Sequence, residues 1–114
     1  MQDYKTEIEI EGIKYPVAFT LNVMASIQEK YETFNKWAEL TDGASGEVNI
    51  KAIIYGLTCM INEGIDIENE EKGEKRPMVK EKQVGRIMTK LGIAETTKTL
   101  NDVVINSTKS DEKN

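Results

Sequence analysis

The longest apolar run of the chain, residues 49–64 with the sequence NIKAIIYGLTCMINEG, sets the strongest limit on how this sequence can fold. At about 100° per residue of an α-helix, its polar positions fall on one narrow line. The large apolar side chains fill most of the remaining circumference: Ile50, Ile53, Ile54, Leu57, Met60 and Ile61. Such a helix must be covered from several directions. Asn49 can cap its start and Gly64 can end it, so the sequence predicts a central core helix from Asn49 to Gly64.

Length and composition limit the class of protein. A chain of 114 residues suits one domain. We expect a globular domain over residues 1–105 and a disordered tail over residues 106–114, where no apolar residue remains. The central run is too short and too interrupted to span a bilayer, and no secretory apolar segment is found. A soluble, cytoplasmic protein without membrane contacts is therefore expected.

The inventory of reactive side chains argues against catalysis. Cys59 is the single cysteine, and the chain has no histidine. The usual zinc and haem sites and histidine-assisted catalysis therefore lack their ligands and bases. A net charge of −5 repels phosphate backbones. We expect no enzymatic activity, no metal, no cofactor and no nucleic acid, and we expect proteins as partners, a second copy of the chain among the options.

The N-terminal part has the two-residue period of a β-hairpin. Ile8 and Ile10 alternate with glutamates, Glu11-Gly12 can form the turn, and residues 13–19 alternate again. Pro16 cannot donate a ladder hydrogen bond, so its side of the strand should be an edge or face solvent.

The rest of the chain predicts helices. Thr20 or Asn22 caps a helix that breaks near Glu32 and Thr33, and residues 34–40 continue with a similar period. After the core helix, Ile65 to Val79 is acidic and predicts a mobile loop. Residues 81–91 form another helix ended by Gly92, and residues 93–105 form either a last helix or a terminal strand. The fold class is α+β and mainly helical: a hairpin followed by four to five α-helices around the central helix.

Aromatic residues supply the candidate protein-binding site. Tyr31, Phe34 and Trp37 lie on neighbouring helical turns and could anchor a partner, because aromatic residues dominate interface hot spots. Burial in the core is the alternative for Trp37. Tyr15, beside Pro16, could fix a protein-binding edge of the hairpin, or simply belong to the end of a strand.

Two other candidate sites are set aside. Asp66, Glu68 and Glu70 alternate like the first ligands of a calcium-binding EF-hand, but the required glycine is Glu71 and the required final glutamate is Pro77. Cys59 lies in the most apolar helix without a histidine to lower its pKa, which favours a small buried filler over a reactive thiol.

Four segments together resemble a known family. They are YPVAFTLNVMASIQEKY, FNKWAEL, KAIIYGLTCMINEGID and EKQVGRIMTKLG. In this order they look like the tail assembly chaperones of long-tailed bacteriophages and of prophages in low-GC Gram-positive bacteria. The resemblance covers most of Glu7 to Leu100, and it includes a hairpin that runs into a helix through Phe19 to Asn22.

The resemblance implies a non-enzymatic role in the cytoplasm of the host bacterium. Such a chaperone would bind the tape measure protein during tail building, keep it soluble, and help to deliver the tail tube protein. In many phages a programmed frameshift adds a second domain, and the codons of Glu112 to Asn114 can contain a slippery heptamer. The alternatives are a small structural protein that completes the tail or head, and an acidic inhibitor or antitoxin.

Overall fold

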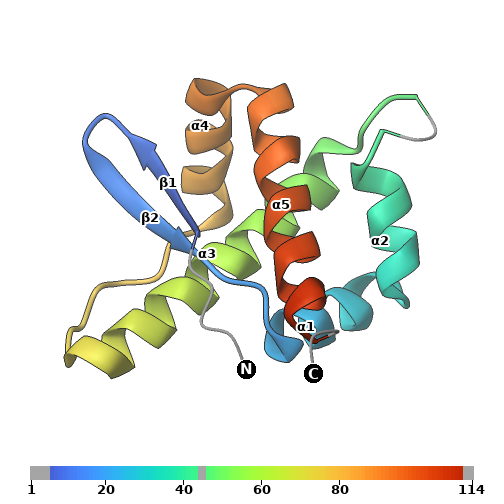
Figure 1. Cartoon of the computed structure of the whole chain (residues 1–114). Coiled ribbons are helices and arrows are strands. Elements are labelled where there is room, and N and C mark those ends of the chain that lie inside the picture. Colours follow the sequence, from blue (N-terminus) through green and yellow to red (C-terminus); the bar gives the residue numbers. More distant parts are fainter. Residues whose placement is uncertain (1–5, 44–45, 112–114) are drawn as a thin grey trace.

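The chain folds as a β-hairpin followed by five helices, of which the longest, α3, is central and the other four are arranged around it (Figure 1). The computed structural model describes the backbone of residues 6–43 and 46–111, and the side chains of these residues except 108–111. The elements are β1 (Thr6–Ile10), β2 (Ile13–Val17), α1 (Leu21–Tyr31), α2 (Phe34–Thr41), α3 (Ile50–Lys72), α4 (Glu81–Leu91) and α5 (Ile93–Asp111). The predicted fold class is confirmed.

The hairpin has the turn that its sequence predicts. β1 and β2 are antiparallel, with Thr6 opposite Val17 and Ile10 opposite Ile13. Glu11 and Gly12 both have positive φ, of 53° and 83°, as a two-residue hairpin turn requires.

The second strand crosses α3 at very short range. An ideal Cβ on Gly64 would lie 2.8 Å from the carbonyl carbon and oxygen of Pro16. The N–H of Ala18 then donates a hydrogen bond to the carbonyl of Met60, at 3.0 Å. β2 is an edge strand, as Pro16 predicts, but Pro16 is buried against α3 and does not face solvent. Gly64 permits this crossing because it has no side chain.

The prediction that Gly64 ends the central helix is therefore wrong. α3 continues to Lys72, and Gly73 ends it with the left-handed φ of 67°. Ile65 is fully buried one turn after Ile61, so the core-facing side of the helix extends beyond the predicted end. Residues 65–72 are thus helical, and only the remainder of the predicted loop connects α3 to α4.

The helix boundaries elsewhere follow their capping residues. The hydroxyl of Thr20 accepts a hydrogen bond from the N–H of Asn22, and the side chain of Asn49 accepts one from Ala52. The predicted break between α1 and α2 is confirmed, with Glu32 at a φ of 76° and Thr33 capping α2.

Gly92 ends α4, as predicted. The last two helices form an antiparallel pair (Figure 1). α5 settles the choice between helix and strand for residues 93–105. It buries Thr96, Leu100 and Val103 and runs on to Asp111, six residues beyond the predicted end of the globular part. Residues 112–114, with the frameshift codons, lie outside the described part of the chain.

The core is built around α3, which packs against β2, α1, α2 and α4, while α5 packs on α4. Its buried apolar side chains are Ile8, Val17, Val23, Ile27, Trp37, Ala52, Ile53, Leu57, Met60, Ile61, Ile65, Val79, Val84, Ile87, Met88, Leu100 and Val103. Among the described helices, none is both long and apolar enough to cross a membrane.

Candidate functional site

Trp37, the central residue of the predicted aromatic surface, belongs to the core. Its side chain is 3% exposed, and its indole Nε1–H donates a hydrogen bond of 2.9 Å to the carbonyl of Ala52 in α3. The ring lies so close to α3 that an ideal Cβ on Gly56 would be 2.3 Å from its Cζ2 atom. Trp37 therefore fixes α2 on α3, and its ring is not accessible to a partner in this fold.

The other two aromatic residues also pack mainly within the molecule. The ring of Phe34 contacts Phe19 at 5.8 Å and Trp37 at 5.4 Å between centroids, and Tyr31 contacts Tyr55 at 5.9 Å. Both Phe34 and Tyr31 are half-buried. Because the break after Tyr31 changes the direction of the chain, these residues do not form one continuous aromatic face.

Tyr15 lies elsewhere, on β2. The guanidinium of Arg76 sits 5.3 Å from the centre of its ring, a cation–π contact between the hairpin and the segment after α3. Within the described part of the chain, no ring contact connects Tyr15 to Tyr31, Phe34 or Trp37. The structure thus does not bring the four predicted binding residues together.

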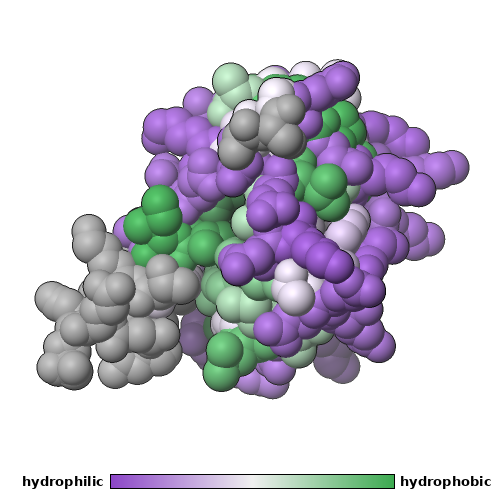
Figure 2. All heavy atoms as spheres, turned by 90° about the vertical axis from the view of Figure 1, so that its right-hand side faces the viewer, coloured by the Kyte–Doolittle hydropathy of each residue, from purple (hydrophilic) through white to green (hydrophobic). Residues whose placement is uncertain are grey.

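The side of the molecule on which α2 lies is mixed in character. Figure 2 shows hydrophilic side chains over much of the described part of this side, with hydrophobic areas between them.

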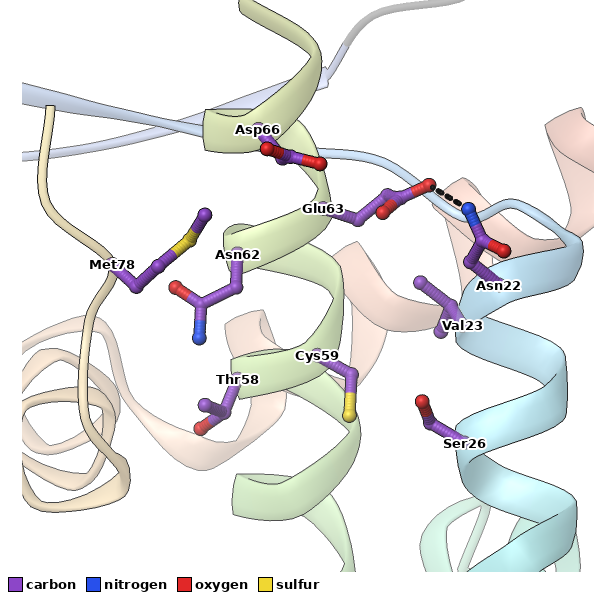
Figure 3. Close-up of a pocket in the computed structure, with 9 residues that line it drawn as sticks. All are labelled: Asn22, Val23, Ser26, Thr58, Cys59, Asn62, Glu63, Asp66 and Met78. Carbon is purple, nitrogen blue, oxygen red and sulfur yellow. Dashed lines mark hydrogen bonds between the residues drawn. The ribbon is translucent and has the colours of Figure 1, made fainter. Parts of the chain in front are cut away.

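An open groove runs along α3. It has a volume of about 360 Å³, with α3 as its floor, α1 as one wall and the segment before α4 as the other (Figure 3). The lining residues are Asn22, Val23, Ser26, Thr58, Cys59, Asn62, Glu63, Asp66 and Met78.

Two asparagines of α3 hold the wall that contains Met78. Asn69 donates to the carbonyl of Arg76 and accepts from its N–H, at 3.0 and 3.1 Å. Asn62 does the same for Val79, at 3.0 and 2.7 Å. Each asparagine side chain thus pairs with one residue of segment 74–80 as a neighbouring strand would. The part of the predicted mobile loop that precedes α4 is therefore fastened to α3.

The opposite wall is held by Glu63. Its carboxylate accepts hydrogen bonds from the Thr20 hydroxyl at 2.6 Å and from the Asn22 side-chain amide at 3.2 Å, the second of which is drawn in Figure 3. These bonds connect the start of α1 to the middle of α3. Asp66, one turn further along α3, is exposed, and its carboxylate meets no cation among the described residues.

Cys59 lies on the floor of the groove and is half-buried. Burial raises the pKa of its thiol above the ordinary value, which keeps it protonated at neutral pH. The neighbouring Tyr55 donates its hydroxyl hydrogen to the carbonyl of Ser26, at 3.2 Å, and burial raises the pKa of Tyr55 to about 12. Neither group is activated for proton transfer or nucleophilic attack near neutral pH.

The three acidic residues whose spacing resembles that of an EF-hand calcium-binding loop lie on a helix. Asp66, Glu68 and Glu70 belong to α3, so they do not form a loop that could wrap around an ion. Within residues 6–43 and 46–111, no group of three or more His, Cys, Asp or Glu side chains is placed to hold a metal ion.

The sequence analysis assigned no binding role to the groove residues. One usable signal was the spacing of Asn62 and Asn69, seven residues apart and so on one side of a helix. The predicted end at Gly64 separated the two asparagines and concealed this pattern.

Comparisons with protein-family models, curated proteins and solved structures found no match for the chain.

Proposed function

We propose that this protein is a tail assembly chaperone of a long-tailed phage or prophage. In this role it binds the tape measure protein in the cytoplasm of the host bacterium, keeps it soluble, helps to deliver the tail tube protein, and catalyses no reaction. The proposal starts from the order of the four sequence segments that resemble this family.

The groove along α3 is the observation that supports the proposal most strongly. It combines the apolar side chains of Met78 and half-buried Cys59 with polar and acidic ones. Helical partners are commonly bound in such grooves through apolar anchors at helical spacing. Met78, which is 48% exposed, adds a flexible contact that can adapt to different apolar side chains. A chaperone for a long helical protein needs this tolerance.

Co-expression tests the proposal directly. The tape measure protein encoded in the same phage or prophage genome is produced with and without this chain, and its soluble fraction is measured. We expect the tape measure protein to be largely insoluble alone, and to be soluble and co-purified when both are present. Equal solubility in the two cultures, without co-purification, would contradict the proposal.

Purified virions separate the chaperone from a structural tail or head protein. A chaperone of this type is expected to leave the particle before it is complete, so mass spectrometry of virions should not find the chain. Its presence in stoichiometric amounts would favour the structural alternative.

A further inference from the structure

The groove along α3 carries two kinds of chemistry, arranged along its length. Met78 and the half-buried Cys59 supply accessible apolar surface, whereas Val23 also lines the groove but is only 2% exposed. Glu63 and Asp66 place two carboxylates towards one end (Figure 3). The lining residues of α3 extend from Thr58 to Asp66, about 12 Å of helix at 1.5 Å per residue. This length matches about two turns of a second helix lying alongside.

Both walls of the groove are fixed before any partner arrives. Asn62 and Asn69 hold the segment with Met78, and Glu63 holds the start of α1 through Thr20 and Asn22. A preformed groove loses little conformational entropy on binding.

The backbone of the walls favours a helical partner over an extended one. An extended peptide gains its affinity from hydrogen bonds to an open strand edge. One wall here is a helix, and the N–H groups of Arg76 and Val79 in the other are already bonded to asparagine side chains of α3. Recognition must therefore come from side chains, as when a helix lies in a groove.

The charge of the groove indicates which side chains fit. The Glu63 carboxylate already accepts two hydrogen bonds, whereas Asp66 is exposed and has no cationic partner in the described part of the chain. A lysine or arginine of the partner would complement both carboxylates if it lay one helical turn from an apolar side chain in the groove.

We propose that this groove binds one helical segment of a partner protein in which an apolar side chain is followed, one turn away, by lysine or arginine. The apolar side chain contacts Met78 and Cys59, and the basic group pairs with Asp66 beside Glu63. The inference depends on the proposed function only for the identity of the partner, the tape measure protein.

A displayed library of helical 16-residue peptides tests the groove without the tape measure protein. We expect selection on the purified full chain to enrich peptides with an apolar side chain and a basic residue three or four positions away. Asp66→Lys should weaken the selected peptides about tenfold or more, because it replaces a charge attraction with a repulsion. Glu7→Lys makes the same charge change on the exposed face of β1, outside the groove, and should change affinity less than about twofold.

The single cysteine provides a second, site-specific readout. A bound peptide should slow alkylation of Cys59 by iodoacetamide at alkaline pH, and it should not do so in Asp66→Lys at the same peptide concentration. A peptide with its basic residue changed to glutamate should regain affinity for Asp66→Lys.

Several results would overturn the groove proposal. These are a selection that yields no binder, selected peptides without basic residues, equal weakening by Asp66→Lys and Glu7→Lys, or unchanged alkylation of Cys59 in the complex. If the peptides bind as expected but the co-expressed tape measure protein stays insoluble, the groove assignment stands and the proposed function fails.

Discussion

At the scale of single residues, two glycines of α3 set how closely other elements approach the central helix. Gly56 lies under the ring of Trp37, and Gly64 lies under the backbone of Pro16. Glycine inside a helix normally costs stability relative to alanine, by about 1 kcal/mol. Here each glycine permits a contact that a methyl group would block.

Gly56→Ala should destabilise the protein by roughly 1 to 2 kcal/mol, because overpacking this contact outweighs the gain in helix propensity. The indole cannot easily move away, since its Nε1–H is bonded to the carbonyl of Ala52. Urea unfolding followed by circular dichroism measures the change.

Gly85→Ala is the matched control, because Gly85 also lies inside a helix but its ideal Cβ would be 3.6 Å from the Cδ1 of Ile54, an ordinary contact. This variant should gain about 0.5 to 1 kcal/mol. If both substitutions stabilised the protein, the close approach of Trp37 to α3 would be incorrect.

Tyr55 predicts a specific loss of stability at alkaline pH. Its pKa is raised from 10.0 to about 12 in the folded state, mainly by burial. Between these values the unfolded chain releases the phenolic proton before the folded chain does, so stability falls as pH rises. Tyr55→Phe should lower the melting temperature at pH 7, because it removes the hydrogen bond to Ser26. The difference in melting temperature between wild type and variant should then become smaller from pH 10 to pH 12. A difference that stays constant over this range would contradict the raised pKa of Tyr55.

At the scale of elements, the connection from α3 to α4 is held by side chains of α3. Its composition is typical of a solvated loop, but Asn62 and Asn69 satisfy both backbone groups of Val79 and of Arg76. Such a pair of hydrogen bonds from one asparagine side chain to the backbone of one residue orders an irregular segment without adding a strand. It also fixes Met78, the residue next to Val79, at the edge of the groove.

Amide hydrogen exchange measured by NMR tests the hydrogen bonds of Asn62 and those of Asn69 separately. Asn69→Ala should speed exchange at the Arg76 amide about tenfold or more while the Val79 amide stays protected, and Asn62→Ala should do the reverse. Each variant is the control for the other. Unchanged exchange at both amides in both variants would show that the segment is held by other contacts.

Element by element, the sequence predicted most of the fold. Alternation identified the hairpin, side-chain caps identified the starts of α1 and α3, and Gly92 identified the joint before α5. The end of α3 was missed because a glycine can either end a helix or admit a neighbouring backbone, and only the path of Pro16 distinguishes the two. The groove was missed for another reason, because it joins residues of α1, α3 and the segment with Met78 that are distant in sequence.

At the scale of the whole molecule, one helix serves both as the core and as the floor of the candidate binding site. α3 contacts the hairpin, α1, α2 and α4, and it leaves one stripe of its surface open between α1 and Met78. The aromatic residues predicted as a binding surface, Tyr31, Phe34 and Trp37, instead pack mainly within the molecule. A partner therefore meets a groove whose shape is determined by the same contacts that hold the fold together.

NMR titration tests the central claim, that a tape measure helix binds along α3, most directly. The ¹⁵N-labelled chain is mixed with the tape measure segment that it solubilises, and changes in amide chemical shift are mapped onto the structure. We predict that the largest changes lie at the groove-lining residues of α1, at residues 58–66 of α3 and at Met78, and that Asp66→Lys removes them at the same concentrations. Changes centred on α2 around Phe34, on the outer face of the hairpin, or nowhere in the chain would contradict the claim.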